Sequence, residues 1–347
     1  MKAAVVKGLD TLRVEEVPTP ECEDGDALVR VGACAICGSD IRILHHGNPR
    51  VTFPAILGHE AAGEVVAVGK RVKRVRIGDR IAIGGDVPCG TCTFCIAGLG
   101  NNCPTNYAMG YQFPGSFAQY VLLNELVLTH GPVTPIPDTL SFEEAALAEP
   151  LGCVLHALEM CRVQLGDTVV IMGAGPIGYM LAEVSRHLGA SRVILVNRSS
   201  SRLQYASRFG VTETVCSIET DPVTAIRDLT QGRGADVILT ACPSPEAQAQ
   251  ALSMARNRAR INFFGGLPPG RSQVTLDTNL IHYRELFVLG SHGCLPRHHA
   301  QAVELLAQGI INAKKYISHR FSLDDIEEAF RTAESHGGLR VVVLPNA

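Results

Sequence analysis

The chain has 347 residues, of which 46% are hydrophobic and 19% are charged. This length suits about two domains of ordinary size, and the composition is that of a globular protein. The formal net charge of −3 provides no basic field to attract nucleic acid or an anionic membrane, so the composition argues against both classes of partner.

The apolar stretches of the chain are short. The stretch within residues 1–8 is too short for the core of a signal peptide, and the uncharged run 168–182 is too short to cross a bilayer. We therefore expect a cytoplasmic protein without a membrane segment. In such a protein, clusters among the 12 cysteines more often bind metal than form disulfides.

The first half of the chain predicts an irregular β structure. Residues 26–34 alternate between apolar and polar side chains with the period of a half-buried strand. A second strand is expected at 64–68, between glycines that suit tight turns and bulges.

After about residue 150 the pattern changes to strands that alternate with helices. The expected strands are 168–172, 192–196, 235–240 and 260–264, and the expected helices are 176–188, 201–209 and 246–255. This alternation predicts an α/β fold with a parallel, doubly wound sheet. A helix at 324–334 and a strand at 340–344 are expected to end the chain.

A glycine-rich turn joins the first of these strands to its helix. Its sequence matches G-x-G-x-x-G, with glycines at 173, 175 and 178 and with Pro176 and Ile177 between them. Gly173 would make the tight turn, Gly175 would let the backbone approach a pyrophosphate, and Gly178 would let helix and strand pack closely. The free N–H groups of the helix N-terminus favour an anion, and Pro176 fits the first helical turn. The strand and helix around the motif favour a dinucleotide site over a purely structural turn.

The end of the next strand bears on the choice of cofactor. An Asp or Glu there would bind the ribose 2′-hydroxyl of NAD, but this chain has Asn197, followed by Arg198, Ser199 and Arg202. No carboxylate repels a 2′-phosphate, and two guanidinium groups are available to bind one. The pattern favours NADP, with NAD as the alternative if both arginines are only solvated.

Four cysteines follow one another closely in a Gly- and Pro-rich segment: Cys89, Cys92, Cys95 and Cys103. Thiolates at such spacing can converge on one tetrahedral ion, and zinc is the usual occupant of an all-cysteine site. Four ligands close the coordination shell, so this zinc would be structural. A [4Fe–4S] cluster is the chemical rival, but nothing else in the sequence indicates electron transfer.

Candidate ligands for a second, catalytic zinc are scattered over three segments. These are Cys37-Gly-Ser39-Asp40, Gly58-His59-Glu60 and Ala148-Glu149-Pro150. A catalytic zinc needs about three protein ligands and an open position for substrate, which Cys, His and a carboxylate would supply. Taken one at a time, each residue is more often part of a core, and spacing alone does not show that the segments meet.

In combination and in this order, the three segments, the cysteine lobe and the glycine-rich turn resemble the zinc-dependent medium-chain dehydrogenase/reductase family over essentially the whole chain. Glu149, where classical alcohol dehydrogenases carry Cys, is similar to the sorbitol, threonine and sugar-alcohol branch. The sorbitol enzymes themselves often lack the full cysteine lobe, so the resemblance does not single them out.

The resemblance implies the roles of the residues. Cys37, His59 and Glu149 would surround the catalytic zinc, Glu60 would be a direct ligand or a group that can exchange with one, and Ser39 would handle the hydroxyl proton. Together with the cysteine lobe this implies two zinc ions per chain. Many relatives carry His five residues after the zinc cysteine, but here the position is Arg42, which cannot readily pass on a proton. His45 or His46 could replace it, but we favour both as surface residues.

The resemblance also implies the architecture. Residues 1–152 and 294–347 would form a GroES-like, β-rich catalytic domain, and residues 153–293 would form an inserted Rossmann domain. The family usually forms homodimers or homotetramers, and residues 285–289 are apolar enough for an interface strand or for core.

The motifs and the resemblance together predict a zinc-dependent oxidoreductase that transfers hydride between a nicotinamide cofactor and a secondary alcohol or ketone. The resemblance to the sugar-alcohol branch implies that the substrate is a polyol, sugar or cyclitol-like molecule. The positive charges of Arg198 and Arg202 favour an alternative function, that of an NADPH-dependent biosynthetic ketone reductase. A third hypothesis, from another class, is a non-catalytic protein that binds dinucleotide and zinc.

Overall fold

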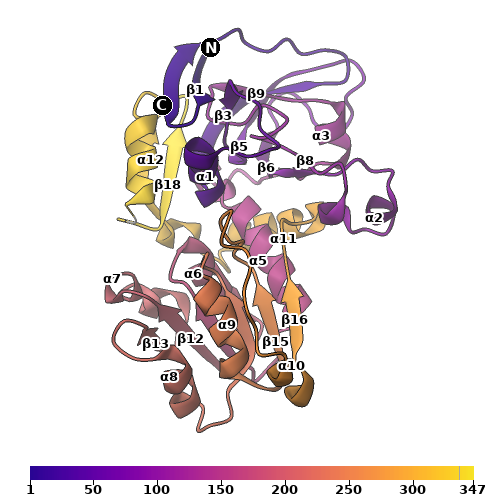
Figure 1. Ribbon diagram of the computed structural model, residues 1–347. Helices are drawn as coiled ribbons and strands as arrows, with labels where there is room; N and C mark the ends of the chain where they lie inside the picture. Colours follow the sequence, from indigo (N-terminus) through magenta and orange to yellow (C-terminus); the bar gives the residue numbers. More distant parts are fainter. Residues whose placement is uncertain (336) are drawn as a thin grey trace. The chain divides into compact units, whose positions relative to one another are not determined.

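The computed structural model describes residues 1–335 and 337–347, which divide into two compact units (Figure 1). The first unit contains Met1–Cys153 and Gly293–Ala347, and the second contains Val154–His292. Among the described residues, no helix is both long enough and apolar enough to cross a membrane.

The first unit is built on an open sheet with the strand order β10-β6-β5-β3-β18-β17, and β9 also pairs with β3. These strands are β3 (Ala27–Ala35), β5 (Glu60–Val68), β6 (Arg80–Ile83), β9 (Tyr120–Leu123), β10 (Val133–Pro135), β17 (Ile317–Ser322) and β18 (Arg340–Leu344). A smaller sheet joins β2 (Thr11–Glu16), β1 (Lys2–Gly8) and β4 (Ala55–Ile56), and β7 (Asp86–Val87) pairs with β8 (Tyr107–Ala108). The sheet faces bury a core of aliphatic side chains such as Val29, Val31 and Val65.

Short helices surround these sheets. They are α1 (Gly38–His46), α2 (Thr93–Ile96), α3 (Glu125–His130), α4 (Phe142–Ala145), α11 (Pro296–Ala307) and α12 (Ile326–Glu334), with 3-10 turns at Gly100–Asn102 and Ala313–Lys315. Helix α5 (Ala148–Cys161) begins in the first unit and continues into the second.

The second unit is the parallel, doubly wound sheet that the alternation predicted, and the α/β fold class is confirmed. All pairs in the order β13-β12-β11-β14-β15-β16 are parallel. The strands are β11 (Thr168–Met172), β12 (Arg192–Asn197), β13 (Glu213–Cys216), β14 (Ala235–Thr240), β15 (Ala255–Phe263) and β16 (Phe287–Gly290). The helices are α6 (Pro176–His187), α7 (Ser200–Leu203), α8 (Pro222–Leu229), α9 (Pro245–Met254) and α10 (Thr278–Arg284). Every residue of the inner strands β11 and β14 is buried, as expected for strands covered on both faces.

The helix expected at 201–209 is wrong in detail. The segment forms α7 and a separate 3-10 turn at Ala206–Phe209, closed by Gly210 with φ of 72°. The reason is that the Tyr179 hydroxyl donates a hydrogen bond to the carbonyl of Arg202, which a continuous helix would use internally. The Tyr179 ring also packs on Phe209, with ring centroids 4.6 Å apart.

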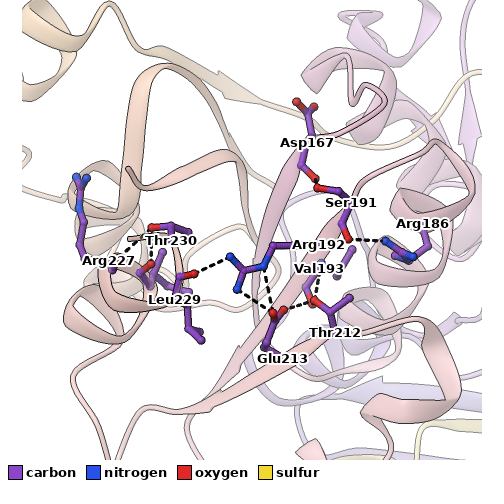
Figure 2. Close-up of polar contacts among 11 residues, drawn as sticks. Asp167, Arg186, Ser191, Arg192, Val193, Thr212, Glu213, Arg227, Leu229 and Thr230 are labelled. Carbon is purple, nitrogen blue, oxygen red and sulfur yellow. Dashed lines mark hydrogen bonds and ion pairs between the residues drawn. The ribbon is translucent and has the colours of Figure 1, made fainter. Parts of the chain in front are cut away.

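The edge strand β13 was not expected from the sequence and is fixed by polar contacts (Figure 2). Arg192, at the start of β12, donates to Glu213 Oε1 from Nε at 3.1 Å and from Nη2 at 2.8 Å, and to the Leu229 carbonyl at 2.6 Å. The Thr212 hydroxyl accepts from Val193 N at 3.0 Å. One arginine therefore ties β12 to β13 and to the end of α8.

Candidate zinc and dinucleotide sites

Three of the scattered ligand candidates meet in the first unit. One potential ligand atom each of Cys37, His59 and Glu60 lies within 4.8 Å of the others. Cys37 precedes the first turn of α1, and Glu60 begins β5, where it pairs with Ala35 at the end of β3. The antiparallel pairing of β3 with β5 thus brings the Cys37 segment beside His59 and Glu60.

A buried carboxylate that the sequence reasoning did not assign, Asp40, holds this cluster in place. Its Oδ2 accepts from the Cys37 N–H at 2.9 Å, and its Oδ1 lies 3.4 Å from His59 Nδ1. Burial lowers the pKa of His59, but Asp40 and Cys37 outweigh burial and hold it well above the ordinary value. The three-residue spacing from Cys37 to Asp40, typical of a capping box, was the signal that could have identified it.

Arg340, the first residue of β18, is a second site residue that was not identified from the sequence. Its Nη1 lies 2.9 Å from Glu60 Oε2 and donates to the Ile36 carbonyl at 3.0 Å. The side chains of Arg340 and Glu60 are 5% and 0% exposed, so the pair is buried. The sequence does not indicate this pairing, because Arg340 and Glu60 lie 280 positions apart in the chain.

Glu149 lies beside the cluster but outside the group within 4.8 Å. A methyl group at Gly85 would lie 3.5 Å from His59 Cδ2 and 3.6 Å from Glu149 Oε1, so both side chains border the same space. Burial raises the pKa of Glu149 to about 7, against the influence of His59. The Cys153 thiol donates to Glu149 Oε1 at 3.7 Å.

Ser39 and Tyr111 form a polar wall next to the same imidazole. Ser39 Oγ lies 3.4 Å from His59 Nε2, and the Tyr111 ring centroid lies 6.0 Å from that of His59. Burial raises the pKa of Tyr111, while His59 and a hydrogen bond with Ser39 act in the opposite direction. Ser39 and Tyr111 therefore both lie beside the His59 imidazole.

His45 and His46, considered above as proton-relay groups, form no hydrogen bond or ring contact with Ser39, His59 or Tyr111 in the part of the chain that the structure describes. His45 is held on both ring nitrogens by carboxylates, Asp10 at 2.5 Å and also Glu334, which raises its pKa. His46 and Arg42 are exposed at the surface of α1.

The residues of the cluster fit a catalytic zinc. His59 Nδ1 and both carboxylate oxygens of Glu60 are buried without a well-aligned hydrogen bond within the described part of the chain. A thiol, an imidazole and carboxylates are the donors that catalytic zinc sites use. Burial raises the pKa of Glu60, and a divalent cation would offset the cost of its charge.

The four cysteines of the lobe also converge. One sulfur from each of Cys89, Cys92, Cys95 and Cys103 lies within 4.8 Å of the others, and all four are free thiols. Two backbone N–H groups, those of Cys89 and Cys95, donate to sulfurs of the group at 3.4 and 3.5 Å. Hydrogen bonds from the backbone of Thr91 contribute most to lowering the pKa of Cys89 to about 5, which favours the thiolate that zinc requires.

The glycine-rich turn in the second unit has the geometry of a dinucleotide loop. Gly173 has φ of 121°, and a Cβ on Gly178 would come within 1.8 Å of the Gly173 carbonyl oxygen, so only glycine fits there. Gly175 precedes α6, and Pro176 occupies the first helical turn. Around Gly175 the only atom that a Cβ would meet within 4 Å, among the described residues, is Arg202 Nη1 at 3.5 Å, so the backbone is open to a ligand.

The polar residues after β12 contact this turn. Asn197 Oδ1 accepts from the Ala174 N–H at 3.0 Å, and its Nδ2 donates to the Ser199 carbonyl at 2.9 Å. Arg202 Nη1 lies 3.4 Å from the Ala174 carbonyl, while Arg198 is exposed. The Asn197 side chain is thus used to hold the loop, and Arg202 reaches the turn itself.

Comparisons with known proteins give the family. Residues 23–138 match the alcohol dehydrogenase GroES-like domain, and residues 176–308 match the zinc-binding dehydrogenase domain. The chain is 33% identical to a sorbitol dehydrogenase of Bacillus subtilis, covering 100% of this chain and 98% of the relative. It belongs to the zinc-binding alcohol dehydrogenase family.

Other relatives agree with this assignment. A D-arabitol-phosphate dehydrogenase of Enterococcus avium is 32% identical over 98% of this chain and 95% of its own. A zinc-binding dehydrogenase from Sinorhizobium meliloti 1021, solved with NADP, is 35% identical with a TM-score of 0.92 over 99% of both chains. Galactitol-1-phosphate dehydrogenase from Escherichia coli is 27% identical with a TM-score of 0.90 over 99% of this chain and 100% of its own.

Family membership confirms that the chain is a zinc-dependent oxidoreductase of alcohols and that the sugar-alcohol branch was the right resemblance. It argues against the hypothesis of a non-catalytic binding protein.

Proposed function

We propose that this protein is an NADP-dependent dehydrogenase that interconverts a secondary alcohol and a ketone in a polyol or sugar-like substrate. The observation that carries the proposal is the convergence of Cys37, His59 and Glu60 within 4.8 Å, with Glu149 beside them. This donor set would hold the catalytic zinc, and the cysteine lobe would hold the structural one.

The protein's own residues have distinct parts in this reaction. When bound, zinc supplies Lewis-acid polarisation of the substrate oxygen. Ser39, whose Oγ lies 3.4 Å from His59 Nε2, accepts the hydroxyl proton of the alcohol and passes its own to water. Asp40 holds Cys37 and His59, and Arg340 compensates the charge of Glu60.

The cofactor preference rests on the loop after β12. We propose that Gly173, Gly175, Pro176, Ile177 and Gly178 bind the pyrophosphate, and that Arg202, Arg198 and Ser199 bind the 2′-phosphate. Arg202 contacts the turn, and no carboxylate occurs between Asn197 and Arg202 to repel a phosphate. The relative solved with NADP supports the same choice.

We propose further that the first unit is the catalytic domain and the second the dinucleotide domain. The exposed edge strand β16 supports a homodimer or homotetramer, and the enzyme would act in the cytoplasm. The arginines at 198 and 202 also favour a second candidate direction, NADPH-dependent reduction of a ketone.

The test combines metal analysis with turnover. The purified protein should contain two zinc ions per chain and should oxidise polyols or reduce the matching ketoses faster with NADP(H) than with NAD(H). Cys37→Ser should retain one zinc and lose at least about 99% of kcat, because a Lewis acid contributes several kcal/mol to the transition state. A chain that binds both zinc ions but turns over no alcohol or ketone with either cofactor contradicts the proposal.

A further inference from the structure

Arg50 is a half-buried cation without a counter-ion in the part of the chain that the structure describes. Its Nη2 donates to the Asn106 carbonyl, and its Cζ lies 4.8 Å from the centroid of the Tyr111 ring. Its Nε is buried with no hydrogen-bond partner. No carboxylate within residues 1–335 and 337–347 forms an ion pair with it at 4.0 Å or less. A guanidinium has five N–H donors, so most of the binding capacity of Arg50 is unused.

Two other buried or half-buried arginines of the same unit differ in this respect. Arg340 is paired with Glu60. Arg80 donates to two carbonyls and lies 3.7 Å from Asp138. The position of Arg50 is therefore not explained by a structural ion pair.

Tyr111 connects Arg50 with the reactive end of the site. The Tyr111 ring, against which the guanidinium lies, is 6.0 Å from the His59 imidazole between ring centroids, and the Ser39 hydroxyl lies 3.4 Å from the same imidazole. The distance from the guanidinium to the imidazole therefore cannot exceed the sum of the distance from Arg50 to the Tyr111 ring and the distance from that ring to His59. A substrate whose reacting oxygen lies at Cys37, His59 and Glu60 needs only a chain of several carbons to reach it.

We propose that Arg50 recognises an anionic group, a phosphate or a carboxylate, carried by the alcohol substrate a few carbons from the reacting carbon. The guanidinium fork binds such groups through paired hydrogen bonds, and the cation–π contact with the Tyr111 ring holds the guanidinium beside it. A neutral substrate would leave the half-buried cation without a counter-ion, whereas an anionic substrate supplies one. This inference rests on the proposed function and narrows its substrate class.

The experiment compares three substrates with the same carbon skeleton: galactitol, galactitol 1-phosphate and galactonate. Steady-state kcat/KM is measured with NADP for the zinc-loaded wild type, Arg50→Gln and Arg50→Lys. The wild type should favour one anionic substrate over galactitol by tenfold or more, mainly through KM. Arg50→Gln should lose that preference with galactitol turnover unchanged, and Arg50→Lys should keep part of it.

Arg76→Gln is the matched control, because it removes one exposed positive charge from the same unit and should keep the preference. Zinc content and thermal midpoint are measured for each variant, because the hydrogen bond to Asn106 also ties Arg50 to the fold. If Arg50→Gln loses turnover of all three substrates equally together with zinc, the role is structural and the inference is overturned. Turnover without an anion preference, or a preference that survives in Arg50→Gln, also overturns it. No turnover of any of the three with either cofactor would instead contradict the proposed function.

Discussion

At the scale of single residues, Arg202 offers the most direct test of cofactor choice. Its guanidinium lies at the glycine-rich turn, 3.4 Å from the Ala174 carbonyl, and burial lowers its pKa. We expect Arg202→Ala to weaken NADPH binding by about tenfold, or about 1.4 kcal/mol, and to leave NADH binding nearly unchanged. Titration calorimetry measures both, with the exposed Arg233→Ala as the charge control. An equal loss for both cofactors would show that Arg202 supports the loop rather than the 2′-phosphate.

The two carboxylates proposed as zinc ligands, Glu60 and Glu149, should respond differently to neutralisation. Glu60→Gln leaves the buried Arg340 without its counter-ion, so we expect a loss of about 3–5 kcal/mol in the free energy of unfolding together with the catalytic zinc. Glu149→Gln leaves that pair intact, so its effect should be on zinc affinity and kcat with little loss of stability. Denaturant titration and metal analysis of both variants check this. Equal destabilisation by the two substitutions would contradict the assignment.

At the scale of elements, the cysteine lobe should lose its metal independently of the catalytic cluster. Cys103→Ser removes one of four converging sulfurs, so we expect zinc to fall from two ions to one per chain and the thermal midpoint to drop. Cys22→Ser is the control, because Cys22 belongs to neither ligand group. Retention of both ions by Cys103→Ser would mean that three thiols and water suffice.

His299 of α11 should give the first unit a pH-dependent stability. Its Nδ1 lies 2.8 Å from the Thr134 hydroxyl on β10, and burial, helped by Arg74, lowers its pKa from 6.5 to about 3. Below pH 6.5 the His299 imidazole is protonated in the unfolded chain but stays neutral in the folded chain, so the free energy of unfolding falls as the pH drops from 6.5 toward 3. The slope from this residue is at most about 1.4 kcal/mol per pH unit. For His299→Gln we expect the free energy of unfolding, measured by denaturant titration at several pH values, to fall less steeply toward acid pH than in the wild type. An unchanged pH dependence would show that His299 is not the group responsible.

At the scale of the whole molecule, the sequence predicted what local patterns encode. Strands β11, β14 and β18 begin and end where they were predicted, because apolar runs and flanking turns are short-range signals. The edge strand β13 was missed because only one of its four residues is buried. Arg340 was missed because its partner Glu60 lies far away in the chain and is brought near only by sheet pairing. Asp40 was missed although its spacing from Cys37 is a local capping signal, because its contact with His59 arises only in the fold. The ligand roles and the domain boundaries proposed from the sequence stay predictions for the experiments above.

The edge of the parallel sheet leads to a prediction about assembly. Strand β16 pairs only with β15 among the described strands, and Phe287 on it is 48% exposed. An open, apolar edge invites pairing with another chain, and soluble proteins usually cover such edges. We therefore expect a homodimer in which β16 pairs with its copy, and we expect Phe287→Lys to shift the protein toward monomer by placing like charges in that interface.

Analytical ultracentrifugation over a concentration series measures the shift. Ile218→Lys is the control, because Ile218 is 67% exposed in the same unit but lies away from the strand. If both variants keep the wild-type mass, the copies associate through another surface or not at all.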